Sequence, residues 1–113
     1  MHQMRFEKEL FKKRYRTYRN YLEARCEALP AQIEKNFKNT SVYHEASTCF
    51  GMSNYIDVEK QDENGDTLKQ FTIRISDHIP TGSGENCDGY IYIDGKTWAE
   101  IKAEVFDFIS ERI

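Results

Sequence analysis

The feature that most constrains this chain is a six-residue stretch, residues 71–76, in which apolar and polar side chains alternate. Its apolar members are Phe71, Ile73 and Ile75, and a polar residue follows each of them. Alternation with a period of two predicts a β-strand with one face in a core and the other face in water. Proline has no backbone N–H to donate to a sheet, so we expect the strand to end before Pro80.

Two further stretches predict strands that accompany the first. Upstream, Ile56 and Val58 alternate with polar residues, and Asn64-Gly65 lies between this run and residues 71–76. Asn-Gly is a strong signal for a tight hairpin turn, which would pair the two runs antiparallel. Downstream, residues 89–93 place tyrosines on one face of a strand and isoleucines on the other.

The two ends of the chain have helical patterns. Between residues 4 and 29 apolar side chains recur mostly at intervals of three and four, which predicts a long helix. Pro30 either ends this helix or begins another, and residues 31–38 are interpreted as a short second helix. The polar residues 39–47 are predicted to form a loop. Near the C-terminus, Thr97 and Glu100 have the spacing of a capping box and predict a helix over residues 97–112. Its predicted buried stripe comprises Trp98, Ile101, Val105, Phe108 and Ile109, and Phe106 falls off this stripe.

These elements predict one α+β domain over all 113 residues, built in two layers. Residues 1–38 would form a basic helical part, with the long N-terminal helix and the short second helix. Residues 48–94 would form an antiparallel sheet of three strands, which a fourth could extend, and residues 97–112 the C-terminal helix. The formal net charge of −3 is unevenly distributed, because residues 1–38 carry +5 and residues 39–113 carry −8.

Composition and cysteine spacing argue against several classes of protein. The sequence has no apolar run long enough for a membrane span and no hydrophobic leader at its start, so we expect a cytoplasmic protein without a membrane partner. Its three cysteines are an odd number and have no C-x-x-C spacing, so neither a disulfide framework nor a zinc site is expected.

The predicted first helix carries two surfaces that could bind a partner. Its basic face follows intervals of three and four and comprises Arg5, Lys8, Lys12, Arg16 and Arg19. Such a face is either an ordinary solvated helix surface or a contact for phosphates or an acidic protein. A second apolar group, about 100° around the helix from the main apolar stripe, comprises Phe6, Leu10 and Tyr21. We interpret this group as an interface for a partner protein or for a second copy in a homodimer.

Motifs for catalysis are weak. Gly95-Lys96-Thr97 resembles the end of a phosphate-binding loop, but Tyr90 stands where the motif requires glycine. Asp77 and His78 are adjacent in an extended segment, so we expect their side chains to point to opposite faces rather than to form a dyad. A small hydrolase that uses one of them is the enzymatic alternative, and it would require a concave pocket around these side chains. The cysteines and histidines have no spacing typical of a metal site or a thiolate nucleophile. We therefore expect no enzyme activity, no catalytic residue, no cofactor and no metal.

The sheet tyrosines are open to two interpretations. Tyr90 and Tyr92, joined by Tyr55 if it lies across from them, could stack on RNA bases. The acidic charge of residues 39–113 opposes this, and favours packing of the tyrosines beneath the first helix.

Residues 47–80 resemble a segment of small uncharacterised proteins of phages and conjugative elements. The likeness consists of a serine- and tyrosine-containing stretch at residues 47–55, a short acidic hairpin, and the strand with its Ser-Asp-His end at residues 71–78. The resemblance implies a protein that works in the cytoplasm of an invaded bacterium. Small proteins of that kind often bind and block a host defence complex, such as a CRISPR effector.

We therefore predict a non-enzymatic binding protein of a phage or mobile element, which inhibits a host complex that handles nucleic acid. Its partner would be a host protein or a protein–nucleic-acid complex. The alternative is an accessory protein that binds nucleic acid directly through the basic face of the first helix.

Overall fold

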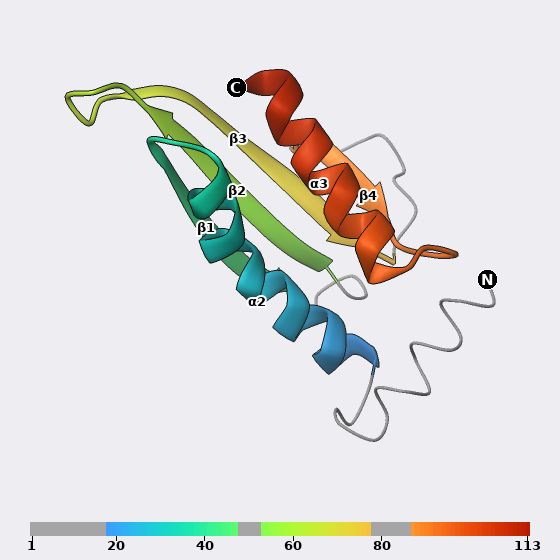
Figure 1. The fold of residues 1–113 in the computed structure, drawn as a ribbon. Helices are drawn as coiled ribbons and strands as arrows, with labels where there is room; N and C mark the ends of the chain where they lie inside the picture. The colour runs from blue at the N-terminus through green and yellow to red at the C-terminus, as the bar shows by residue number, and fades with distance from the viewer. Residues whose placement is uncertain (1–17, 48–52, 78–86) are drawn as a thin grey trace.

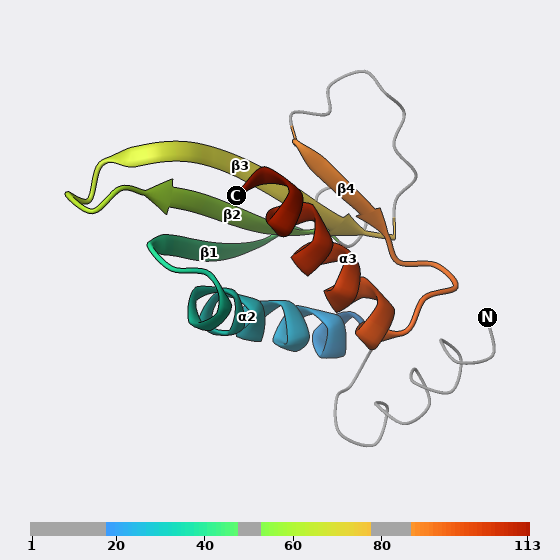
Figure 2. The same ribbon diagram turned by 45° about the horizontal axis from the view of Figure 1, so that its top comes forward.

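A computed structural model describes residues 18–47, 53–77 and 87–113 of the chain. Within these residues, two helices and a four-stranded sheet form two layers, and both helices lie on the same face of the sheet (Figures 1 and 2). The predicted α+β class is confirmed. In chain order the elements are α2 (Tyr18–Asn36), β1 (Thr40–Ser47), β2 (Ser53–Gln61), β3 (Thr67–Ser76), β4 (Gly89–Tyr92) and α3 (Trp98–Arg112).

The sheet is mixed, so the prediction of a purely antiparallel sheet is wrong. The strands lie in the order β1-β2-β3-β4, with antiparallel pairing from β1 to β3 and parallel pairing between β3 and β4. Parallel neighbours cannot be joined by a two-residue turn, and twelve residues separate the end of β3 from the start of β4 in the sequence. The side chains of β4 alternate in the same way whether the strand pairs parallel or antiparallel, so the sequence pattern could not distinguish the two arrangements.

The predicted loop at residues 39–47 is also wrong, because residues 40–47 form the edge strand β1. Val42 lies opposite Val58 on the helix-facing side of the sheet and is buried. Most other side chains of β1 are polar and partly or fully exposed, as an edge strand permits. Asn39 has a φ of 55° between α2 and β1, a conformation that asparagine tolerates at helix ends.

The division of the helix at Pro30 is wrong as well. Helix α2 continues from Tyr18 to Asn36 with Pro30 inside it. Proline removes one helical hydrogen bond, but buried residues continue on both sides of it, from Leu22 to Ile33. Packing of this continuous apolar stripe therefore outweighs the local cost. The earlier part of the predicted helix, up to residue 17, lies outside the described residues.

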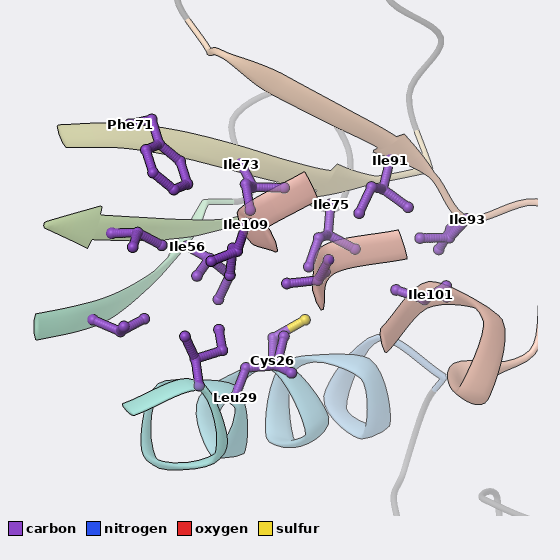
Figure 3. Close-up of a cluster of buried hydrophobic side chains, with 14 of the residues drawn as sticks. Cys26, Leu29, Ile56, Phe71, Ile73, Ile75, Ile91, Ile93, Ile101 and Ile109 are labelled. Carbon is purple, nitrogen blue, oxygen red and sulfur yellow. The ribbon is translucent and has the colours of Figure 1, made fainter. Parts of the chain in front are cut away.

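The core lies between the helices and the sheet (Figure 3). Its centre is formed by isoleucines from the strands and from α3, and by Cys26 and Leu29 from α2. Phe106, which the sequence pattern places off the buried stripe of α3, in fact packs against this core. Its ring centroid lies 5.9 Å from that of Phe37. Of the predicted buried stripe of α3, Ile101, Val105 and Ile109 are buried, and Trp98 and Phe108 are partly buried against the core.

The predicted hairpin between β2 and β3 is confirmed, with a turn built differently from the expected Asn-Gly pair. Only Gly65 of that pair has a positive φ, of 88°. The carboxylate of Asp62 accepts hydrogen bonds from the backbone N–H groups of Asn64 and Asp66, at 2.8 and 2.9 Å. The aspartate side chain thus holds the turn, as Asx turns do.

The capping box of α3 is present. The Thr97 hydroxyl accepts a hydrogen bond from the Glu100 N–H at 3.2 Å, and the Glu100 carboxylate accepts one from the Thr97 N–H at 3.1 Å. Hydrogen bonds from the backbone and the side chain of Thr97 lower the pKa of Glu100 below its ordinary value of 4.5. This cap fixes the start of the helix that covers β4.

Replacement of Thr97 by alanine should lower the free energy of unfolding by about 0.5–2 kcal/mol at neutral pH. Because the folded-state pKa of Glu100 is depressed, its contribution is present above 4.5 and is lost as the pH falls through the lower folded value. Urea unfolding should therefore show a smaller difference between wild type and Thr97→Ala in acid. Thr97→Ser keeps a capping hydroxyl and serves as the control; an equal loss in both variants would contradict the capping argument.

Candidate functional site

The structure describes one residue of the predicted basic face. Arg19 lies in the first turn of α2 and is exposed. The other four members, Arg5, Lys8, Lys12 and Arg16, lie outside the described residues. Direct binding of nucleic acid by this face therefore stays a prediction.

Tyr21 is the member of the predicted apolar interface on the first helix that the structure describes. Tyr21 is 1% exposed, and its hydroxyl accepts a hydrogen bond from Arg25 Nε at 3.1 Å. The burial of Tyr21 gives this group no support as an exposed interface, and the interface stays a prediction. Phe6 and Leu10 lie outside the described residues.

The groups weighed for catalysis are not gathered into a site by the described residues. Asp77 is exposed at the end of β3, and His78 lies outside the described residues. In the described part of the chain, no group of three or more His, Cys, Asp or Glu side chains could hold a metal ion. Burial raises the pKa of the Cys26 thiol far above its ordinary range, and the charges of Glu23 and Glu27 raise it further. That thiol is therefore a neutral core side chain rather than a nucleophile.

Lys96, the lysine of the incomplete phosphate-loop motif, is paired within the fold. Its Nζ lies 2.9 Å from a carboxylate oxygen of Glu104 on α3. Gly95 has a φ of 79° and allows the chain to turn from β4 towards the helix. The motif is thus a turn followed by a helix cap, as its missing glycine indicates.

The strongest candidate surface is the face of the sheet that lies opposite α2 and α3, which we call the outer face. Successive side chains of a strand point to opposite faces of the sheet. The isoleucines of β3 and β4 therefore face the helices, and the residues between them face the other side. From β1 to β4, the members of the outer face that concern function are Tyr43, Glu45, Ser53, Tyr55, Asp57, Glu59, Thr72, Arg74, Ser76, Tyr90 and Tyr92. Tyr90 and Tyr92 do not lie beneath α2, contrary to the interpretation that favoured packing under the first helix.

Arg74 occupies the centre of the outer face and is only 8% exposed. Its Nε and Nη2 donate hydrogen bonds to Ser53 Oγ at 3.1 and 2.8 Å, and Ser53 Oγ is 3.1 Å from Ser76 Oγ. The guanidinium carbon lies 5.7 Å from the ring centroid of Tyr55 and 5.4 Å from that of Tyr90. These distances are typical of cation–π contacts, so the arginine holds both rings in place.

The β1–β2 side of the outer face combines tyrosines with carboxylates. Tyr43, 56% exposed, lies opposite Asp57, and the exposed Glu45 lies opposite Tyr55. Asp57 also accepts a hydrogen bond from the Thr72 hydroxyl at 2.5 Å, which fixes its position. Aromatic ring faces and carboxylates both attract cations. This side of the sheet therefore suits Lys and Arg side chains of a partner.

Two features of this surface were missed by the sequence analysis. Tyr43 belongs to residues 39–47, which were predicted to form a loop. The contacts of Arg74 with Tyr55 and Tyr90 depend on which strands are neighbours in the sheet. The available signal was alternation, which correctly placed Arg74 opposite the core-facing isoleucines of its strand.

No protein-family model, curated protein or solved structure matches the chain. Within the described part of the chain, neither helix is sufficiently long and apolar to cross a membrane.

Proposed function

We propose that this chain works by binding another protein through its outer face, without catalysing a reaction. The observation that carries the proposal is the cluster of tyrosines held around Arg74, with Tyr43 exposed beside it. Tyrosine and arginine are enriched among the residues that contribute most to protein interfaces. Because Arg74 already orients two of the rings, little side-chain entropy would be lost when a partner binds.

The charges of the outer face favour a basic protein over a nucleic acid. Glu45, Asp57 and Glu59 lie on its β1–β2 side and would repel phosphates. The same carboxylates would attract a basic groove, such as proteins that handle nucleic acids present. The proposed function therefore includes the inhibition of a host nucleic-acid-handling complex, the role that the resemblance to phage and mobile-element proteins implies.

Replacement of Tyr43 by alanine should weaken partner binding at least about tenfold, because it removes the most exposed ring of the face. The partner would first be isolated from a bacterial host lysate on the immobilised wild-type protein, and its affinity for each variant then measured by calorimetry. Tyr43→Phe keeps the ring and should bind nearly as well as wild type.

Ile113→Ala is the control, because Ile113 is another exposed large side chain, 38% exposed, and lies at the end of α3 on the opposite side of the sheet. Equal affinity of wild type and Tyr43→Ala would contradict the proposal. Salt-sensitive binding of a random oligonucleotide that is unaffected by Tyr43→Ala would instead support the basic face of the first helix.

A further inference from the structure

The outward edge of β1 presents backbone groups that the rest of the sheet does not use. The N–H of Gln61 donates a hydrogen bond to the carbonyl oxygen of Asn39 at 2.8 Å, which sets the phase of the antiparallel β1–β2 ladder. In such a ladder the hydrogen-bonded positions alternate along each strand. The odd-numbered residues of β1 therefore bond to β2, and the even-numbered residues direct their N–H and C=O groups to the outer edge.

A contact from α2 supports this phase independently. The backbone N–H of Val42, an even-numbered position, donates a hydrogen bond to Glu34 Oε2 at 2.8 Å. Farther along the edge are His44 and Ala46, and Ala46 is exposed. Within the described part of the chain, no other residue satisfies the outward backbone groups of these two positions. Unsatisfied backbone groups on an edge strand are a template for another strand.

The helix beside this edge determines the charge that such a strand should carry. Helix α2 lies alongside β1 in both views (Figures 1 and 2). Glu23, Glu27 and Glu34 fall within about 40° of one another around the helix, given about 100° per residue. Because Glu34 reaches the edge of β1, this acidic stripe borders the same edge. Glu27 and Glu34 are exposed, and Glu23 is partly exposed.

We infer that an extended, positively charged segment of the partner protein binds as an additional strand along β1 at His44 and Ala46, with its Lys and Arg side chains against the acidic stripe of α2. Main-chain hydrogen bonds would supply affinity, and the charges would select the segment. The inference deepens the proposed function and rests on it, since it gives the chemistry of a partner for a protein that works by binding.

The experiment uses the full chain and a display library of random ten-residue peptides. Selection should enrich peptides rich in Lys and Arg, and binding should weaken as salt is added. With one enriched peptide bound, the amide exchange of His44 and Ala46 should slow at least about tenfold, because these N–H groups become hydrogen-bonded. Peptides without a basic bias, or bound peptides that leave both amides unprotected, would overturn the inference.

Two substitutions test the edge and the stripe separately. Ala46→Pro removes the outward N–H while sparing the ladder to β2, as proline on an edge strand does, and should weaken the peptide at least about tenfold. Glu27→Lys should weaken it by a similar factor through charge alone. Glu111→Lys makes the same change at an exposed position on α3 and should leave affinity unaltered. Unchanged affinity in Glu27→Lys would overturn the inference even if Ala46→Pro disturbs β1.

Binding of the isolated host partner separates this inference from the proposed function. If Tyr43→Ala abolishes partner binding while Ala46→Pro and Glu27→Lys leave it unchanged, the outer face is the interface and the edge inference is wrong. If Tyr43→Ala leaves partner binding unchanged, the proposed function itself is wrong.

Discussion

Replacement of Ile73 by alanine is expected to lower the free energy of unfolding by about 2–5 kcal/mol. Ile73 is 0% exposed on β3, where it lies between Ile56 on β2 and Gly89 on β4. Truncation removes apolar contacts and leaves a cavity that three hydrogen-bonded strands cannot easily close. Urea unfolding followed by far-UV circular dichroism measures the change.

Leu68→Ala provides the control for this prediction, because it truncates an aliphatic residue on the same strand. Leu68 is 61% exposed, so its removal should change the free energy of unfolding by less than about 0.5 kcal/mol. A similar loss from both substitutions would show that burial on β3 does not determine the stability of the fold.

Replacement of Gly89 by alanine is expected to cost about 1–3 kcal/mol through overpacking. A Cβ atom at position 89 would lie 2.6 Å from two ring carbons of Phe108 on α3. That ring packs edge-on against Phe71, with centroids 5.8 Å apart, and the Arg112 guanidinium carbon lies 3.5 Å from its centroid. The ring would therefore have to leave two partners to admit one methyl group.

A double-mutant cycle with Phe108→Ala distinguishes this clash from a general effect on β4. If the ring is the obstacle, Gly89→Ala should cost clearly less in the Phe108→Ala background than in wild type. Additive losses, within about 0.5 kcal/mol, would show that Gly89 is needed for another reason.

Elements with local signals were predictable from the sequence. The capping box of α3, the buried positions of that helix, and the alternation of β2, β3 and β4 each depend on residues within one turn or one pleat. The hairpin was predictable for the same reason, although Asp62 holds its turn. Each of these signals is complete within a few neighbouring residues, so no knowledge of the tertiary structure was needed.

Elements stabilised by distant contacts were not predictable in this way. Strand β1 is mostly polar and becomes a strand because it pairs with β2 along its whole length. Helix α2 continues through Pro30 because its buried residues pack against the core on both sides of the proline. In both cases tertiary packing overrides a local preference. The strength of that packing cannot be estimated from neighbouring residues alone.

The candidate site also has features that were predictable from the sequence and features that were not. The alternating stretch at residues 71–76 by itself determined that Arg74 would lie opposite Ile73 and Ile75, because successive side chains of a strand point to opposite faces. Only the tertiary structure decided that Tyr55 and Tyr90 flank Arg74, since strand order and register place residues that are 19 and 16 positions away along the chain beside it. It also left β1 at the edge of the sheet next to the acidic stripe of α2, because the order of strands is a property of the whole chain.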